Sequence, residues 1–62
     1  MKWFTVRVLI ADIEDTDMLE VMHTKVRSPS AAEATELVLK HQFVLDLVEH
    51  MDEGRVIVSS VA

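Results

Sequence analysis

Hydrophobic and polar residues alternate in two stretches of the chain, as they do in strands that cover a core with one face. The clearest stretch is residues 2–11, which is also rich in β-branched residues. Its core-facing set is Phe4, Val6, Val8 and Ile10, and its other face carries Trp3, Thr5, Arg7 and Leu9. A weaker alternation over residues 18–27 predicts a second strand, whose core-facing set we take to be Met22, Thr24 and Val26. Residues 55–61 form the third predicted strand.

Between the second and third strands, residues 30–51 are predicted to form one long helix. Ser30 is suited to the N-cap, and a glutamate three residues later completes a capping box. The alternative start has Ser28 as the N-cap and Pro29 at the first helical position. Gly54, shortly after the helix, is suited to a left-handed C-terminal cap.

The apolar positions of this helix change direction near its middle. At about 100° per residue, the apolar cluster of the second half is rotated by roughly 90° from that of the first half. Two explanations are open: the helix bends or breaks near His41, or it is straight and carries two apolar faces. His41 shares a face with Leu37 and Val38, so we expect a partly buried, hydrogen-bonded histidine rather than a metal ligand or a base.

These elements predict a single α+β domain of the ββαβ type over residues 1–62. A helix that returns the chain to the start of the second strand makes the third strand parallel to the second. If the third strand then pairs with the first, the sheet has the order 2-1-3 and the helix covers one face.

The other face of this sheet has nothing in the chain to cover it. It should carry Trp3, Thr5, Leu9, Val21 and either Ile57 or Val58. Exposed apolar surface of this kind favours association, and a two-fold symmetric homodimer is the commonest outcome. Our candidate self-association residues are Trp3, Leu9, Val44, Leu47 and Met51.

The composition narrows the functional classes. The 62 residues carry a net charge of −5, which weighs against nucleic acid and anionic membranes as partners and favours a basic protein surface. The chain has no cysteine, and no apolar run approaches the about 18 residues of a membrane span. Its N-terminal stretch lacks the small-residue cleavage site of a signal peptide, so a cytoplasmic location is expected.

Acidic residues between the first two strands form the candidate partner-binding site. The residues of this candidate site are Asp12, Glu14, Asp15, Asp17, Glu20 and Arg55. The loop lacks the sixth-position glycine and the final glutamate of an EF-hand, so calcium is not expected. We predict instead that a protein partner with a basic surface docks here.

The sequence offers little that could support catalysis. None of His23, His41 and His50 is four residues from another, and no cysteine could complete a metal site. The pair Ser59-Ser60 is not part of a Gly-x-Ser-x-Gly elbow. A domain of this size also has little room for a deep pocket. We therefore expect no enzymatic activity, no cofactor and no metal.

The chain also resembles a known family. An aromatic pair opens the first strand in Lys2-Trp-Phe-Thr-Val, the second strand ends in Val26-Arg-Ser, and the helix begins with Ser30-Ala-Ala-Glu-Ala-Thr-Glu-Leu. This arrangement is similar to the small ββαβ inhibitor by which a podovirus shuts off bacterial RNA polymerase. The resemblance implies the same fold and the same target. The polymerase-contacting arginines that the family has in its last strand have no counterpart here beyond Arg55.

Pattern and resemblance together predict a small acidic protein-binding module. Its most specific form is a phage effector that inhibits a host machine such as RNA polymerase in the host cytoplasm. The alternative is a self-associating structural or regulatory subunit without catalytic activity.

Overall fold

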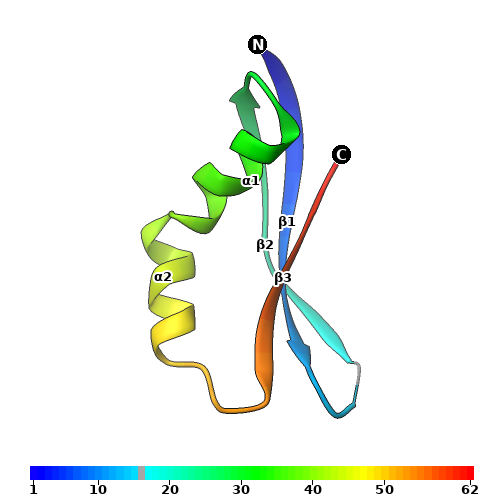
Figure 1. Cartoon of the computed structure of the whole chain (residues 1–62), viewed down its shortest axis with the longest axis vertical. Helices are drawn as coiled ribbons and strands as arrows, with labels where there is room; N and C mark the ends of the chain where they lie inside the picture. Colours follow the sequence, from blue (N-terminus) through cyan, green and yellow to red (C-terminus); the bar gives the residue numbers. More distant parts are fainter. Residues whose placement is uncertain (16) are drawn as a thin grey trace.

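Three strands and two helices make up the described part of the chain. The computed structural model describes residues 1–15 and 17–62, so residue 16 of the acidic loop lies outside the described residues. In chain order the elements are β1 (Lys2–Asp12), β2 (Met18–Ser28), α1 (Ala31–Leu39), α2 (Gln42–Glu49) and β3 (Arg55–Val61). The strands form one layer and the helices lie on one side of it (Figure 1).

The sheet has the predicted order, with β1 in the centre and antiparallel to both neighbours. Phe4 lies opposite Val26, and Val8 lies opposite Met22. At the other edge of β1, Asp12 lies opposite Arg55. The predicted strand boundaries are confirmed to within one residue.

The single long helix is a wrong prediction, because the chain breaks between α1 and α2. His41 has an extended backbone, with φ −63° and ψ 141°, and its ring Nδ1 accepts a hydrogen bond from the Phe43 amide at 3.2 Å. It is therefore the N-cap of α2, and it is exposed rather than partly buried as expected. The break lets the two differently oriented apolar stripes reach the core, where Val38 and Val44 are both buried.

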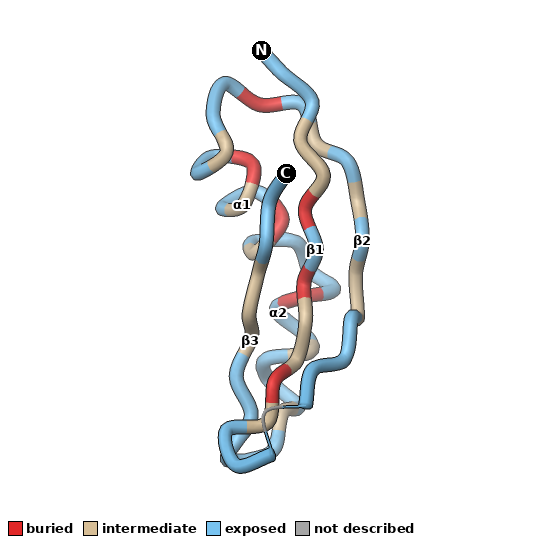
Figure 2. Tube along the Cα trace, turned by 90° about the vertical axis from the view of Figure 1, so that its right-hand side faces the viewer, coloured by how far each residue is buried: buried red, intermediate tan, exposed pale blue. Residues whose placement is uncertain are grey.

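The core lies between β1 and the helices. Its buried members are Val6 and Val8 from β1, Ala34 and Val38 from α1, and Val44 from α2. Half-buried side chains pack around them, among which are Phe4, Met22, Val26 and Ile57. Figure 2 shows the buried positions along β1 and on the helices behind the sheet. The core thus confirms Phe4, Val6 and Val8 of the first predicted core-facing set and Met22 and Val26 of the second. Ile10 and Thr24 are half-buried but lie outside this cluster.

The open face of the sheet differs from the prediction at one position. A β-bulge between Val8 and Leu9 in the pairing of β1 with β2 leaves Val21 as the extra residue. Val21 packs against the core instead of standing on the open face. Ile57 also packs against the core, which leaves Val58, opposite Leu9, as the β3 residue of the open face.

The structure shows which of the two predicted N-cap residues begins α1. The Ser30 hydroxyl accepts a hydrogen bond from the Glu33 amide at 3.2 Å, so Ser30 is the N-cap of α1. Ser28 is fully buried, and its hydroxyl has no hydrogen-bond partner among the described residues.

The predicted C-terminal cap is not formed. Gly54 does have a positive φ of 85°, but it lies in the turn before β3 and does not cap α2, which ends at Glu49. Neither α1 nor α2 is long and apolar enough to cross a membrane.

Candidate functional site

Two acidic segments meet at one end of the molecule. Backbone hydrogen bonds join Asp12 N to the Asp17 carbonyl at 3.1 Å and Ile13 N to the Gly54 carbonyl at 2.8 Å. The second bond joins residue 13, at the start of the β1–β2 connection, to the turn that precedes β3. Both segments lie at the lower end of the molecule (Figure 1). We call this region the acidic end and define it by its carboxylates, which are Asp12, Glu14, Asp15, Asp17, Asp52 and Glu53.

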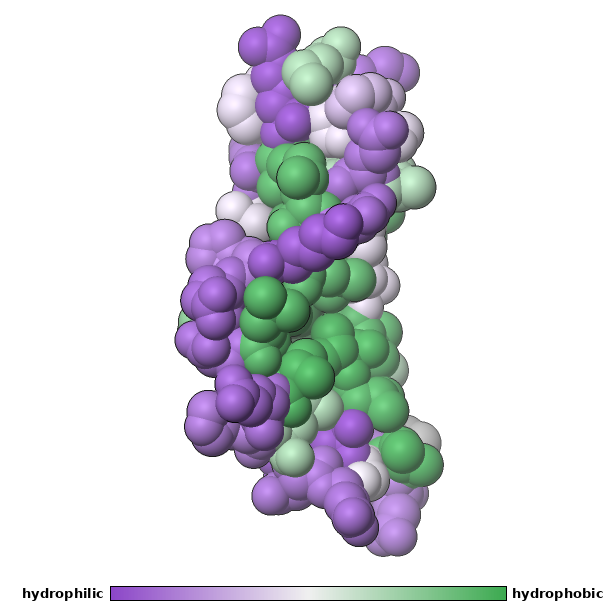
Figure 3. All heavy atoms as spheres, turned by 60° about the vertical axis from the view of Figure 1, so that its left-hand side comes forward, coloured by the Kyte–Doolittle hydropathy of each residue, from purple (hydrophilic) through white to green (hydrophobic). Residues whose placement is uncertain are grey.

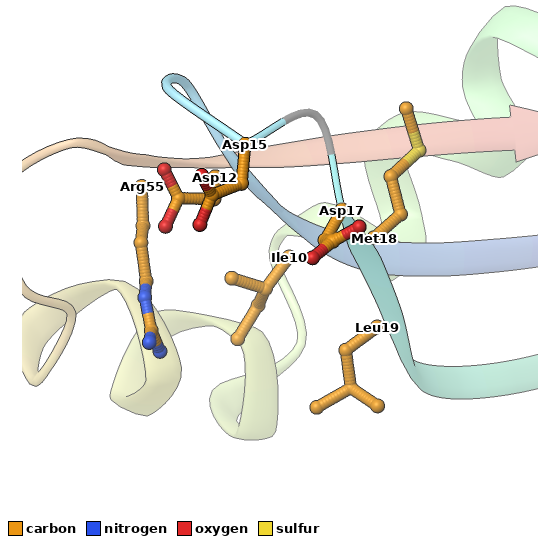
Figure 4. A pocket seen from close by; sticks show the side chains of 7 residues that line it. All are labelled: Ile10, Asp12, Asp15, Asp17, Met18, Leu19 and Arg55. Carbon is orange, nitrogen blue, oxygen red and sulfur yellow. The ribbon is translucent and has the colours of Figure 1, made fainter.

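The acidic end contains a shallow hollow with a mixed lining. The hollow has a volume of about 300 Å³, and it is lined by Ile10, Asp12, Asp15, Asp17, Met18, Leu19 and Arg55 (Figure 4). Met18 is 60% exposed and Leu19 is 67% exposed, and Ile13 in the adjoining loop is 63% exposed. Exposed apolar side chains among carboxylates give a surface that could take both the stem and the charge of a lysine or arginine.

Arg55 is the basic residue among the described residues that line the hollow, and it does not close the hollow. In Figure 4 its guanidinium points away from the carboxylates of Asp12 and Asp15, toward the side on which Ile10 and Leu19 lie. Arg55 is exposed and forms no ion pair with a described residue. The negative potential of the acidic end therefore extends into solvent, where it can act on an approaching partner.

A local hydrogen bond shapes the start of the β1–β2 connection. The Glu14 amide donates to Asp12 Oδ1 at 2.9 Å, which is the pattern of an Asx turn. This bond occupies one carboxylate oxygen of Asp12, while the Glu14 and Asp17 residues are exposed. The carboxylates are thus displayed on a loop whose backbone is tied down at both ends.

Glu20 does not join this site. It lies opposite Leu9, on the open face of the sheet. There its carboxylate is 3.5 Å from Arg7 Nε and 3.9 Å from His23 Nδ1. Both contacts are partly exposed, so solvent screens them and they contribute little to stability. Of the predicted partner-binding residues, the structure therefore gathers Asp12, Glu14, Asp15, Asp17 and Arg55.

The candidate self-association residues are scattered. Trp3 is 67% exposed and stands with half-buried Leu9 on the open face. Val44 is only 2% exposed because the break before α2 turns it into the core, so it cannot contribute to an association surface. Leu47 and Met51 are half-buried.

Sequence reasoning missed part of the acidic end. Asp52 and Glu53 look from the sequence like unfavourable charges at the end of a helix, yet they directly precede Gly54, whose carbonyl accepts a hydrogen bond from the Ile13 amide after β1. The signal that could have found them is the predicted sheet order, since the end of β1 and the start of β3 must then be neighbours. The apolar side chains of the hollow were also missed, because Met18 and Leu19 read as ordinary strand residues.

The remaining polar groups form local contacts on the helices. Lys40 Nζ donates to Glu36 Oε1 at 2.6 Å, and this hydrogen bond and charge lower the pKa of Glu36. Gln42 donates to Asp46 at 2.7 Å, and His50 Nδ1 lies 2.9 Å from the Asp46 carbonyl. Within the described residues, histidine and acidic side chains do not gather in threes at a spacing that would hold a metal ion.

Known proteins give no guide to the site. No protein-family model, no curated protein and no solved structure matches this chain. The geometry of the acidic end and of the exposed apolar surfaces is therefore the basis for assigning a function.

Proposed function

We propose that this chain is a small protein-binding module that docks a basic surface of its partner against the acidic end. The observation that carries the proposal is the hollow in which carboxylates and exposed apolar side chains stand together. A cluster of carboxylates without apolar neighbours could be explained by solubility as easily as by partner binding. Met18 and Leu19, placed among them at 60% and 67% exposure, add apolar area that a partner could bury.

The two kinds of side chain would contribute differently to binding. Carboxylates mainly raise the rate of encounter and exclude acidic partners, and they add less to the affinity. The apolar side chains lose their water when the partner docks, and so they slow dissociation. The partner surface that fits is one in which lysine or arginine side chains surround an apolar centre.

The most specific form of this proposal is a phage effector that inhibits bacterial RNA polymerase. It is supported by the resemblance in the aromatic pair of β1 and the capped helix after β2, together with the shared order of strands around a helical segment. Adding the purified chain to transcription by purified bacterial RNA polymerase tests it directly. We expect fewer transcripts as the chain is titrated in, and unchanged transcription at saturating concentration would refute this form alone.

The wider proposal is tested by capture from bacterial lysate with three immobilised proteins. These are the wild type, the acidic-end variant Glu14→Lys/Asp17→Lys and the control variant Glu33→Lys/Glu36→Lys. Both variants change the net charge by the same amount, but the control places the change on α1. We expect at least one basic protein to be retained by the wild type and the control and lost from the acidic-end variant. Identical retention by all three would show that the acidic end binds nothing specific.

Self-association is a second candidate function, and a separate observation favours it. Large apolar side chains are exposed along both helices as well as on the sheet, and on the helices these are Leu37, Phe43, Leu45 and Val48. Figure 3 shows hydrophobic side chains gathered below a hydrophilic band, with hydrophilic side chains on the left and below and hydrophobic ones reaching the right-hand edge. Contiguous apolar surface of this kind marks an interaction site on small proteins. Sedimentation of the chain from micromolar to millimolar concentration tests whether it forms oligomers.

A further inference from the structure

The two outer edges of the sheet are protected very differently against pairing with another strand. The β2 edge carries charged or titratable side chains along its length, which are Glu20, His23, Lys25 and Arg27. It is also interrupted by the bulge at Val21. Charges and bulges are the devices by which natural sheets keep an edge from recruiting a further strand.

The β3 edge has none of these devices. After Arg55 its sequence is Val-Ile-Val-Ser-Ser-Val, without a charge, a proline or a glycine. Its pairing with β1 runs without a register shift, and no described residue pairs with its other side. A neutral, β-branched segment of this length is a strong candidate for strand pairing.

The hydrogen bonds of the sheet show which backbone groups are available at this edge. Thr5 and Ala62 exchange two backbone hydrogen bonds of 2.9 Å. Such pairs alternate along an antiparallel ladder, so Val56, Val58 and Ser60 also direct their amide and carbonyl groups toward β1. The residues that direct these groups outward are Arg55, Ile57, Ser59 and Val61.

We propose that this edge pairs with the β3 edge of a second copy, joining two sheets into one. The proposal rests on the second candidate function, self-association, and assigns it a surface. The four outward-facing residues can all be used in one register, in which Arg55 meets Val61 and Ile57 meets Ser59 of the second copy. Val58 then meets Val58 of the second copy on the two-fold axis. Shifting the register by two residues leaves at least one outward-facing residue of each copy unpaired.

A second copy fits this edge better than a strand of unrelated sequence for two reasons. The segment is neutral beyond Arg55, so pairing with itself brings no like charges together. A two-fold axis normal to the sheet also places the helices of both copies on the same side. The hydrophobic area in Figure 3 extends from the helices toward β3, so it would be covered in part by its counterpart.

The test compares backbone amide exchange with oligomeric state in the full chain. Sedimentation from low micromolar to millimolar concentration gives the mass, and hydrogen exchange by NMR gives the protection of each amide. We expect a dimer at the higher concentrations, with protection at Ile57, Ser59 and Val61 that rises as the dimer forms. Protection at Val58 and Ser60 should be present in the monomer already, because those amides face β1.

Two variants and a control locate the surface. Ser59→Pro removes an outward amide without removing a bond to β1, and we expect it to weaken dimerisation by roughly tenfold or more. Val58→Lys places two like charges on the axis and should have at least the same effect. In Val56→Lys the lysine meets Ser60 of the second copy, so this charge-matched control should dimerise more tightly than Val58→Lys. Far-UV circular dichroism confirms that each variant is folded.

The outcomes distinguish the assignment of the β3 edge as the dimer surface from self-association itself. A dimer whose outward amides stay unprotected, or which Ser59→Pro and Val58→Lys leave intact, would overturn the assigned edge and leave self-association standing on another surface. A chain that stays monomeric at millimolar concentration would overturn both self-association and the pairing of two β3 edges. The β3 edge could then pair only with a strand of a different protein.

Discussion

At the scale of single residues, two serines on either side of Pro29 have opposite effects on stability. Ser30 uses its hydroxyl to cap α1, which satisfies one of the amides that a helix start leaves without a partner. Ser28 is buried with a hydroxyl that has no partner among the described residues, and burial without a hydrogen bond is costly. The sequence presented both as possible caps, and only the path of the chain after β2 distinguishes them.

The difference can be measured by unfolding in denaturant. We expect Ser30→Ala to lower the free energy of unfolding by about 1 kcal/mol through the lost cap. Ser28→Ala should leave it unchanged or raise it by up to about 1 kcal/mol, because the hydroxyl it removes is unsatisfied. A loss of stability in Ser28→Ala that equals or exceeds the loss in Ser30→Ala would contradict this assignment.

Gly54 gives the second prediction at this scale. Its φ of 85° is strained for a residue with a side chain, while the space around a Cβ there is open. We therefore expect Gly54→Ala to destabilise the chain by about 1 kcal/mol, entirely through the backbone. Gly54→Asn should cost less, since asparagine tolerates this conformation better. Thermal unfolding of the two variants provides the check, and equal stability of wild type and Gly54→Ala would refute it.

The Glu36–Lys40 pair predicts a small pH effect. The hydrogen bond and charge of Lys40 lower the pKa of Glu36 in the folded chain. The stabilisation is therefore present above the pKa of the unfolded chain and is lost as the pH falls through the folded one. Both side chains are exposed, so the effect is weakened by solvent. In Lys40→Met the pKa of Glu36, measured by NMR titration, should rise; an unchanged value would show that the pair does not form in solution.

At the scale of elements, the sequence predicted the strands well and the helices only in part. The alternation in β1, the β-branched residues of β3 and a single consistent topology were enough to give the order 2-1-3. The change of apolar direction near His41 was visible, but a break and a straight helix with two faces give the same pattern. The position of the sheet decides between a broken and a straight helix, because the apolar residues of both halves must face the sheet. The bulge at Val21 likewise depends on the pairing partner and has no local signal.

The cap of α2 makes the helix break testable. His41 is a weaker N-cap than asparagine, because a ring nitrogen replaces the short side-chain oxygen that caps best. We expect His41→Asn to preserve the break and to match or exceed the stability of the wild type. His41→Ala should lose about 0.5–1 kcal/mol, since the Phe43 amide then has no acceptor. If His41→Ala is more stable than the wild type, α1 and α2 have merged into one helix and the break is not intrinsic.

At the scale of the whole molecule, charge is distributed unevenly along the sheet. Carboxylates gather at the acidic end, while Lys2, Lys25 and Arg27 lie on β1 and β2 toward the other end and Arg7 lies at the middle of β1. The sequence predicted the acidic loop, because four carboxylates within six residues are visible without a structure. It did not predict the joining of this loop to residues 52–54 or the apolar lining of the hollow. The first depends on a contact between segments about 40 residues apart. The second was missed because Met18 and Leu19 read as ordinary strand residues.

The proposal that the acidic end is a docking surface is tested most directly by association kinetics with a captured partner. The quantity to measure is the association rate constant of the wild type and of Glu14→Lys/Asp17→Lys as a function of salt concentration. The rate of the wild type should fall as salt rises, since screening shortens the range of the charges to about 8 Å at physiological ionic strength. The variant should associate more slowly at low salt and depend less on salt, with an unchanged free energy of unfolding. Equal rates for the two proteins at every salt concentration would show that the acidic end only keeps the chain hydrated.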